Sequence, residues 1–454
     1  MQTDFKNLPC AVLGFGRAGR AAAEWLLTRG ARVTAYTETP ITPTYAAEFS
    51  ARGVQFRVGP FPDVFEGVVL VRSPGLRPDY PAIRAALARG AQLTSETELT
   101  LAHAPCRVIG VTGSDGKTTT TALIAAILSA AGSTVWQGGN NGYPLLPHVG
   151  EMRADDIAVL ELSSFQLMTC TRAPEVAVLT NLTPNHLNWH TDVDEYAAAK
   201  CRIFHGARRL VTNADCAATA AIAARAALPV TCFSHGGAPL GDTRVFPRGN
   251  ALVLADATGE RAIDCLDEFR LPGRHNLENL MAAVGAVHDL VPPEAIARAA
   301  REFRGVPHRL QYVDTVNGVK YYNSSIDTSP TRTAAALAGL GGAPLVIAGG
   351  QGKGISLTPL ADALATHAKA VFLYGETAGE IERLLAGRVS AVCHHRFADA
   401  FSAAADAAEA GDTVLLSPGC TAFDQFRDFE HRGEYFCALV AARASQFKRK
   451  EPTP

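Results

Sequence analysis

The sequence lacks the features by which membrane-spanning, secreted and nucleic-acid-binding proteins are recognised. No apolar run approaches the ~18 residues of a membrane-spanning helix. The N-terminal stretch has no basic segment followed by a long apolar one, as a secretory leader would. Because 42 basic residues are balanced by 44 acidic ones, the chain has no broad positive field for nucleic acid. We expect a cytoplasmic monomer with no membrane or nucleic-acid partner.

Cysteine patterns that bind metals are also missing. The ten cysteines are scattered without a C-x-x-C pair, which is typical of buried thiols in a reducing compartment. What is present is a globular composition, with 47% apolar and 19% charged residues. A chain of 454 residues is long enough for about three domains.

Short β-branched segments alternate with alanine-rich helical segments along most of the chain, which predicts an α/β fold with parallel sheets. We expect a Rossmann-like domain over residues 1–102, a central P-loop-type ATPase domain over 103–306 and a second Rossmann-like domain over 307–454. The clearest expected strands cover residues 11–13, 32–36, 107–111, 157–160, 176–180, 209–213, 318–322, 344–348, 370–374 and 412–416.

The first glycine-rich turn, which begins at Gly14 and ends at Gly19, fits the pattern G-x-G-x-x-G between an expected strand and helix. Its glycines let the backbone approach a diphosphate, and the start of the helix adds positive partial charge. Glu38 lies about where a ribose-binding carboxylate is expected, so an NAD-dependent oxidoreductase is one interpretation. A tight turn with no ligand is another.

The second glycine-rich turn, Gly-Ser-Asp-Gly-Lys-Thr at 113–118, also follows an expected strand and precedes a helix. Backbone N–H groups of such a turn can cradle phosphate oxygens, the lysine can neutralise them, and the threonine hydroxyl can hold Mg²⁺. The spacing differs from the standard phosphate loop, because two residues rather than four separate Gly113 from the Gly-Lys pair. A triphosphate site remains the better interpretation than a chance Gly-Lys-Thr turn.

Segment 111–118 resembles the shortened phosphate loop of the Mur ligase family, the amide-forming enzymes of peptidoglycan synthesis. Five further segments resemble motifs of that family in the same order, and two of them, 161–166 and 417–426, resemble its D-glutamate-adding member. The chain is therefore identified as a member of this family. The five segments are 161–166, 181–186, 271–276, 305–309 and 417–426.

The resemblance implies an ATP-dependent ligase that adds D-glutamate to UDP-N-acetylmuramoyl-L-alanine. The substrate carboxylate would accept the γ-phosphoryl group, and the amine of glutamate would then attack the acyl phosphate through a tetrahedral intermediate. An alternative is the same chemistry with L-glutamate. A folylpolyglutamate-type synthase would not need the N-terminal domain, an oxidoreductase would leave the later motifs without a role, and a non-catalytic nucleotide-binding protein would not need the catalytic residues.

The resemblance also implies catalytic and nucleotide-binding residues. Lys117, Glu161, His186 and Lys200 would form the catalytic set, and Mg²⁺ would be held by Thr118, Glu161, His186 and, once carbamylated, Lys200. Without the resemblance, Lys200 is an ordinary helix-surface lysine, and the His186–His190 spacing mimics zinc ligands without a supporting cluster. ATP would contact Gly113, Ser114, Asp115, Gly116, Lys117, Thr118, Thr119, Asn276, Asn279 and Arg309.

Substrate-binding residues follow from the same resemblance. Three features depart from the family pattern. Ser324 stands in place of an aspartate, and Ala422 in place of a serine, with Thr421 beside it. The UDP-side aspartate expected at the end of the second strand is absent from residues 33–37, with only Glu38 nearby. These departures bear on acceptor selectivity more than on the reaction type. The UDP substrate would contact Phe15, Gly16, Arg17, Ser73, Asn140 and His186, and glutamate would contact Thr328, Lys353 and Phe429.

Overall fold

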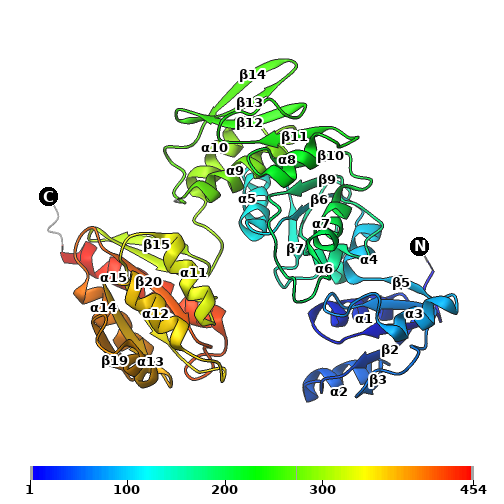
Figure 1. Cartoon of the computed structure of the whole chain (residues 1–454), viewed down its shortest axis with the longest axis horizontal. Coiled ribbons are helices and arrows are strands. Elements are labelled where there is room, and N and C mark those ends of the chain that lie inside the picture. Colours follow the sequence, from blue (N-terminus) through cyan, green and yellow to red (C-terminus); the bar gives the residue numbers. More distant parts are fainter. Residues whose placement is uncertain (1–3, 272, 451–454) are drawn as a thin grey trace. The chain divides into compact units, whose positions relative to one another are not determined.

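The computed structural model describes residues 4–271 and 273–450 (Figure 1). These residues form two compact units, of which the first ends at Phe303 and the second begins at Arg304, while Leu271 and Gly273 group with the second. The described part of the chain contains three sheets, two in the first unit and one in the second. The mixed α/β fold agrees with the sequence, and the domain boundaries expected at residues 102 and 306 stay predictions.

The N-terminal sheet is parallel throughout, with the strand order β3-β2-β1-β4-β5. The chain reverses its direction of travel across the sheet between β3 and β4, and parallel sheets bind ligands beside such a switch point. Its strands are β1 (Pro9–Leu13), β2 (Arg32–Thr37), β3 (Gln55–Val58), β4 (Val69–Arg72) and β5 (Gln92–Thr94). Its helices are α1 (Arg17–Thr28), α2 (Pro43–Ala51), α3 (Pro81–Ala88) and α4 (Glu96–His103).

The central sheet has nine strands in the order β14-β13-β12-β11-β10-β9-β6-β8-β7, parallel from β7 to β12 and antiparallel beyond. The strands are β6 (Arg107–Thr112), β7 (Val135–Gly139), β8 (Ile157–Glu161), β9 (Val176–Leu179), β10 (Arg209–Asn213), β11 (Val230–Phe233), β12 (Thr243–Arg248), β13 (Ala251–Asp256) and β14 (Gly259–Asp264). The helices are α5 (Lys117–Ala130), η1 (Leu146–His148), α6 (Ser164–Leu167), α7 (Val193–Cys201), η2 (Arg202–Phe204), α8 (Ala217–Ala223), α9 (Arg274–Val287) and α10 (Pro293–Glu302).

Strand β6 is apolar on both faces and lies between β8 and β9, as buried parallel strands do. The register pairs Val111 with Glu161 of β8 and Thr112 with Leu179 of β9. The carboxyl ends of these strands therefore meet at one edge of the sheet. That edge carries both the second glycine-rich turn and Glu161.

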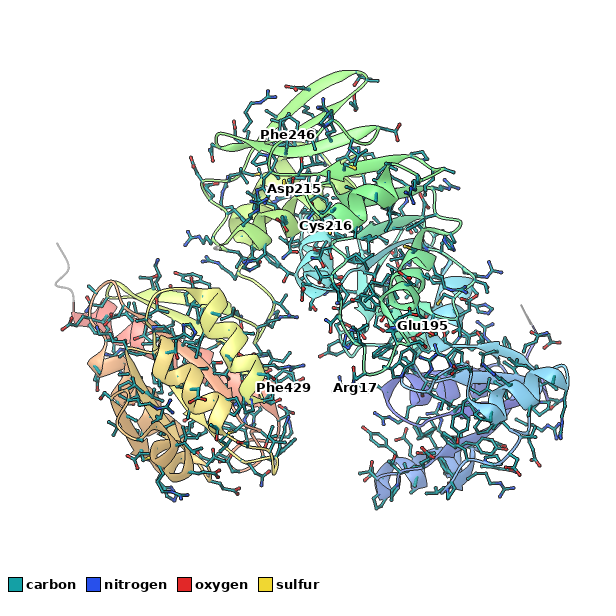
Figure 2. The ribbon with its side chains drawn as sticks, in the orientation of Figure 1. Arg17, Glu195, Asp215, Cys216, Phe246 and Phe429 are labelled. Carbon is teal, nitrogen blue, oxygen red and sulfur yellow. The ribbon has the colours of Figure 1, made fainter. Side chains whose placement is uncertain are left out.

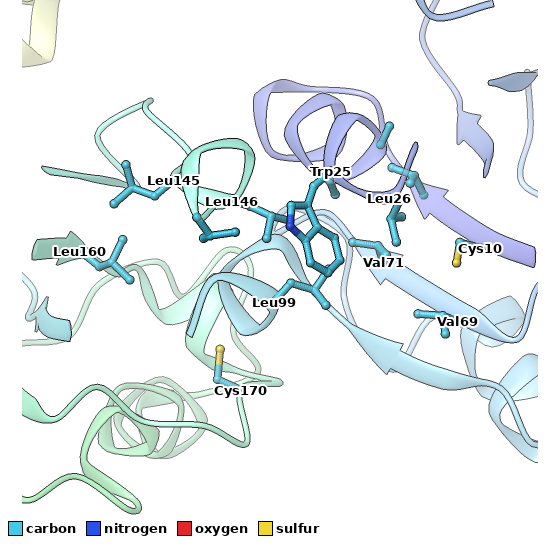
Figure 3. Close-up of a cluster of buried hydrophobic side chains, with 14 of the residues drawn as sticks. Cys10, Trp25, Leu26, Val69, Val71, Leu99, Leu145, Leu146, Leu160 and Cys170 are labelled. Atoms are coloured by element: carbon cyan, nitrogen blue, oxygen red, sulfur yellow. The ribbon is translucent and has the colours of Figure 1, made fainter. Parts of the chain in front are cut away.

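One hydrophobic core extends across the N-terminal and central sheets, which explains why they form a single unit. Trp25 of α1 is almost fully buried and lies between Leu99 of α4 and Leu146 of η1, with Val71 on the side of the N-terminal sheet (Figure 3). Burying an aromatic side chain of this size stabilises the contact by about 2–3 kcal/mol.

The C-terminal sheet has the order β15-β16-β20-β17-β18-β19, with β15 antiparallel to β16 and the other pairs parallel. Separate apolar clusters cover its two faces. The strands are β15 (Gln311–Val316), β16 (Val319–Asn323), β17 (Leu345–Gly349), β18 (Ala370–Tyr374), β19 (Ala391–His394) and β20 (Thr413–Gly419). The helices are α11 (Pro330–Leu340), α12 (Thr358–His367), α13 (Ala378–Leu385), α14 (Phe397–Ala407) and α15 (Phe429–Lys450).

Each of the ten expected strands is present, as β1, β2, β6, β8, β9, β10, β16, β17, β18 and β20. The ten cysteines are all free thiols, but only five are buried, four are half-buried and Cys393 is exposed. Within the described residues, no helix combines the length and the apolarity that crossing a membrane requires.

Candidate active site

The candidate phosphate loop leaves β6 at Gly113 and enters α5 at Lys117. Gly113 and Gly116 have φ angles of +152° and +80°, which side chains rarely adopt. A Cβ atom at Gly113 would lie 1.9 Å from Thr180 Oγ1, and one at Gly116 would lie 2.3 Å from Asn279 Oδ1. Both the backbone and the neighbouring side chains therefore require glycine here.

Residues that follow β9 fix the shape of this loop. Ser114 Oγ donates to Thr183 O over 2.8 Å and lies 2.8 Å from Tyr196 Oη of α7. The Asp115 N–H donates to Asn181 Oδ1 over 2.9 Å. The loop is held in a conformation that places the positive end of α5 at its centre, as an anion site requires.

The first turn of α5 carries several of the predicted nucleotide-binding residues. Lys117 Nζ donates to Gly113 O (2.9 Å) and to a second loop carbonyl, so its charge lies over the loop. Thr118 and Thr119 follow and are half-buried. Thr120 Oγ1 donates to Asn279 Oδ1 over 3.2 Å, and Asn279 in turn bonds Asn276. The structure thus brings the two predicted asparagines of α9 beside the phosphate loop.

Glu161 ends β8 and is 3% exposed. Its Oε1 accepts a hydrogen bond from Asn140 Nδ2 over 2.8 Å. Its Oε2 is buried and has no hydrogen-bond partner within residues 4–271 and 273–450. A buried carboxylate oxygen left in this state is costly, and a hard cation would supply the missing interaction.

Lys200 is not a surface residue, so the interpretation made without the family resemblance is wrong. It is 2% exposed, because the face of α7 that carries Tyr196 and Lys200 packs on the phosphate loop. Lys200 Nζ donates to Gly113 O over 2.7 Å. Burial lowers the pKa of Lys200 to about 6, and the charge of Lys117 adds to that effect. A neutral amine beside a phosphate site is unusual and chemically reactive.

His186 adopts a φ of +56°, a strained value for a residue with a side chain. Its ring contacts Phe165, with centroids 5.0 Å apart. Desolvation lowers the pKa of His186, and the charges of Lys200 and Lys117 lower it further. The imidazole is therefore neutral at pH 7, the form that binds a metal or accepts a hydrogen bond.

A cavity of about 570 Å³ lies at the carboxyl ends of β1, β2 and β4. Of the predicted substrate residues, Phe15, Gly16 and Ser73 line it, and Glu38 lies on its wall. The Phe15 ring packs against two other phenylalanines in the core, so its backbone is the part that faces the cavity. Ser73 Oγ donates to Gly14 O over 3.1 Å and ties the two turns together.

The remaining residues predicted to bind the UDP substrate, Arg17, Asn140 and His186, do not line this cavity. Arg17 donates to Gly142 O over 3.4 Å and so reaches from the first glycine-rich turn to the loop after β7 (Figure 2). Asn140 lies in that loop and binds Glu161. The two residues therefore form a path from the first glycine-rich turn toward Glu161 rather than part of the cavity wall.

In the second unit, Lys353 Nζ donates to Thr328 Oγ1 over 3.1 Å, so the two residues predicted to meet glutamate lie together. Phe429 is labelled in Figure 2, where it begins α15, and its ring lies 6.1 Å from that of His308. Arg309 follows His308 in the chain. Pro272, in the matched segment 271–276, lies outside the described residues.

The two departures from the family pattern in the second unit, Ser324 and Ala422, are both buried. Ser324 Oγ accepts a hydrogen bond from the Leu310 N–H over 3.1 Å, which is a structural role. Ala422 is buried, and the Thr421 hydroxyl donates to Gln351 O over 2.8 Å. The Thr421 hydroxyl is thus already engaged in holding the loop after β17.

The sequence did not predict the roles of several charged residues that make extensive contacts. Arg432 of α15 is fully buried and donates to Ser325, to Tyr374 and to the carbonyls that follow β20. Arg72 and Arg77 connect the turn after β4 with the central sheet. For Arg72 the only local signal is its position at the end of an apolar strand, and that pattern is too common to identify a site.

Comparison with known proteins shows which family the chain belongs to. The Mur ligase middle domain matches residues 111–287, and the Mur ligase glutamate ligase domain matches residues 308–420. The chain belongs to the Mur ligase family. The first match begins in β6 and contains the phosphate loop, Glu161, His186 and Lys200, whereas the second contains Thr328 and Lys353.

Relatives of this Mur ligase are similar over nearly their whole length. The UDP-N-acetylmuramoylalanine–D-glutamate ligase of Ruminiclostridium cellulolyticum is 40% identical and covers 96% of this chain and 97% of its own. The ligase of the same name from Symbiobacterium thermophilum is 41% identical, covering 95% and 97%. The crystal structure of UDP-N-acetylmuramate-alanine ligase from Thermotoga maritima shares the fold, with a TM-score of 0.55, 17% identity and coverage of 96% and 99%.

Proposed function

We propose that this Mur ligase adds D-glutamate to UDP-N-acetylmuramoyl-L-alanine in an ATP-dependent step of peptidoglycan synthesis. The relatives that carry the name of this activity span nearly the whole chain. The observation that carries the proposal is the convergence of Lys117, Glu161 and Lys200 around a strained glycine loop. Such a group of charges suits phosphoryl transfer and has no use in hydride transfer.

The chemistry needs an activated carboxylate, because an amide does not form spontaneously from a carboxylate and an amine in water. In the proposed reaction the carboxylate of the UDP substrate attacks the γ-phosphorus of ATP, and ADP leaves. The amine of glutamate then attacks the acyl phosphate, and phosphate leaves from the tetrahedral intermediate. Lys117 would neutralise charge on the transferred group, while the loop N–H groups and α5 hold the phosphates.

Mg²⁺ fits the residues at the edge of the central sheet. Oε2 of Glu161 is buried and has no hydrogen-bond partner among the described residues. A carboxylate oxygen of this kind is a ligand that hard cations prefer. Thr118 and His186 would complete the set, together with Lys200 in its carbamylated form. When bound, the ion would neutralise the phosphate oxygens.

Carbamylation of Lys200 is part of the proposal because the amine has the required protonation state. With a pKa of about 6, most of the side chain is neutral at pH 7.5. A neutral amine attacks carbon dioxide, the new N–C bond forms, and one proton is released to give an anionic carbamate. This change would turn a buried amine beside Gly113 into an oxygen ligand for the same Mg²⁺ site.

The substrate ends would be held by different parts of the chain. The UDP moiety would occupy the cavity lined by Gly16 and Ser73, beside the switch point of the N-terminal sheet. The pair Lys353–Thr328 would bind the side-chain carboxylate of glutamate, since a lysine and a hydroxyl can both donate to it. Because UDP-linked precursors and ATP are cytoplasmic metabolites, we expect the enzyme to act there.

The test is phosphate release from ATP with UDP-N-acetylmuramoyl-L-alanine and one acceptor at a time. The acceptors are D-glutamate, L-glutamate and L-lysine. Release with D-glutamate alone is the expected result. Release with L-glutamate alone would keep the mechanism and change the acceptor. If no acceptor supported release, the ligase proposal would fail, and the first glycine-rich turn would again be a candidate nicotinamide site.

A further inference from the structure

Arg72, the last residue of β4, is a buried guanidinium that joins the two sheets of the first unit. It is 1% exposed. On one side its Nη1 donates to the carbonyls of Pro74 (3.1 Å) and Leu76 (2.6 Å) in the turn after β4. On the other side its Nη2 donates to Phe165 O (2.6 Å) in α6 of the central sheet. Burial lowers the pKa of Arg72 to about 10, so the group stays charged at pH 7.

Arg77 makes a second connection five residues later. Its Nη1 donates to Trp189 O over 2.6 Å, and Nη1 and Nη2 donate to the two carboxylate oxygens of Glu195 over 3.1 and 2.9 Å. Trp189 Nε1 donates back to Gly75 O over 3.0 Å. Figure 2 labels Glu195, which α7 contributes at the boundary with the N-terminal sheet. This two-oxygen contact is the strong form of an arginine–carboxylate pair.

The contacts continue inward from Glu195. Its Oε2 lies 3.2 Å from Nδ1 of His190, and Nε2 of the same buried ring lies 2.9 Å from Ser164 Oγ. Ser164 begins α6, three residues after Glu161. The backbone N–H of His190 also donates to His186 O over 3.0 Å. A short series of hydrogen bonds therefore connects the two arginines with the segments that carry Glu161 and His186.

The turn that the arginines hold is itself a wall of the candidate UDP cavity, through Ser73, Gly75 and Leu76. One end of the turn is thus bonded to the element after Glu161 and the other to the segment after His186. A UDP substrate is a molecule of fixed chemical length. If its UDP end sits in the cavity, the separation between cavity and phosphate loop decides where its carboxylate lies.

We propose that Arg72 and Arg77 are positioning residues that fix the separation between the UDP cavity and the phosphoryl-transfer site. The inference rests on the proposed function and adds two residues to it that neither bind substrate nor touch the reacting atoms. Reacting atoms must lie about 3–3.5 Å apart, and a displacement of about 1 Å lowers the rate about 100-fold. The two arginines serve this requirement because each bonds both sides of the boundary.

The decisive variant is Arg77→Met, which keeps the side-chain volume and removes the bonds to Glu195 and Trp189, together with the local pair with Asp79. We expect kcat for phosphate release to fall about 10- to 100-fold. The KM for ATP and the inhibition constant of UDP should each change less than about twofold. UDP serves as the probe because it lacks the part of the substrate that extends from the cavity to the phosphate loop. Arg77→Lys, which restores one charged contact to Glu195, should recover part of kcat.

The matched control is Arg52→Met, because Arg52 also pairs with two carboxylates, those of Glu24 and Glu48, but at the exposed surface of the N-terminal domain. It should keep the wild-type kcat. Arg72→Lys, which is the conservative change at the fully buried position, should lower kcat in the same direction as Arg77→Met.

Two results would overturn the proposal. One is a kcat for Arg77→Met within twofold of wild type. The other is a loss of rate that a weaker UDP inhibition constant or partial unfolding at the assay temperature explains in full. Circular dichroism melting of each variant separates unfolding from mispositioning. Failure of the proposed function would look different, because the wild type itself would then release no phosphate with D-glutamate.

Discussion

Replacing Asp327 by asparagine should stabilise the second unit at neutral and alkaline pH. The side chain is 5% exposed, and its Oδ2 accepts a hydrogen bond from Ser417 Oγ over 2.8 Å. Burial raises the pKa of Asp327 from 3.8 to about 6, despite the hydrogen bonds that oppose this shift. An asparagine oxygen can accept the same bond from Ser417 without burying a charge.

The magnitude follows from the two pKa values. A carboxyl whose folded pKa is raised destabilises the fold at high pH, and this penalty fades as pH falls through both values. A rise from 3.8 to about 6 corresponds to a penalty of at most about 3 kcal/mol above pH 7 and about 1 kcal/mol at pH 4.5. In a domain of about 150 residues, 1 kcal/mol shifts Tm by about 2–4 °C.

The assay is thermal melting of the full chain at pH 8 and pH 4.5, followed by circular dichroism. Asp327→Asn should raise the Tm of the second unit by several degrees at pH 8 and by about a third as much at pH 4.5. Asp314→Asn is the control, because Asp314 is exposed in the same unit. An unchanged Tm at pH 8, or an equal gain at both pH values, would show that burial does not penalise this carboxylate.

Three further predictions concern basic side chains. Lys117→Met should lower phosphate release about 1,000-fold or more and leave the inhibition constant of UDP unchanged in a competition assay. Lys200→Ala should be inactive, and short carboxylates such as acetate or formate should restore part of its activity; no rescue would count against the carbamate. Arg432→Met should destabilise the second unit by about 3 kcal/mol or more, measured by urea unfolding, because the carbonyls that follow β20 would lose a buried donor.

The sequence could predict those features that depend on local chemistry. Some glycines of the two turns are required by a positive φ angle, as at Gly116, and others by a close contact within a few residues, as at Gly19 beside Gly14 O. Such requirements are local, so the pattern of glycines is visible in the chain. Apolar runs predicted strands such as β6 and β8 for the same reason. In the hairpin of β15 and β16, the sequence predicted only β16. It did not predict β15, because residues 314 and 315 of that strand are exposed and polar and interrupt its apolar run.

Other features depend on contacts between distant parts of the chain. Lys200 is buried because α7 packs on a loop 87 residues earlier, and its own neighbours in sequence give no sign of this. Arg72 reaches Phe165 across 93 residues, and Arg77 reaches Glu195 across 118. Periodicity within a helix or strand cannot report such partners. The family resemblance supplied the role of Lys200 but named neither arginine, because no motif contains them.

The two glycine-rich turns of the first unit show why similar backbones can support different chemistry. Both follow a strand in the middle of a parallel sheet and both begin a helix, so both offer N–H groups to a phosphate.

The side chains at the ends of the neighbouring strands distinguish the two turns. Beside the first turn, β4 is followed by the neutral hydroxyl of Ser73. Beside the second, β8 ends in Glu161, and α7 adds Lys200. A hydroxyl and backbone N–H groups can hold a diphosphate that does not react, whereas a phosphoryl group in transit develops charge that needs cations and their ligands close by. We therefore infer that the first turn binds the diphosphate of the substrate and that phosphoryl transfer takes place at the second.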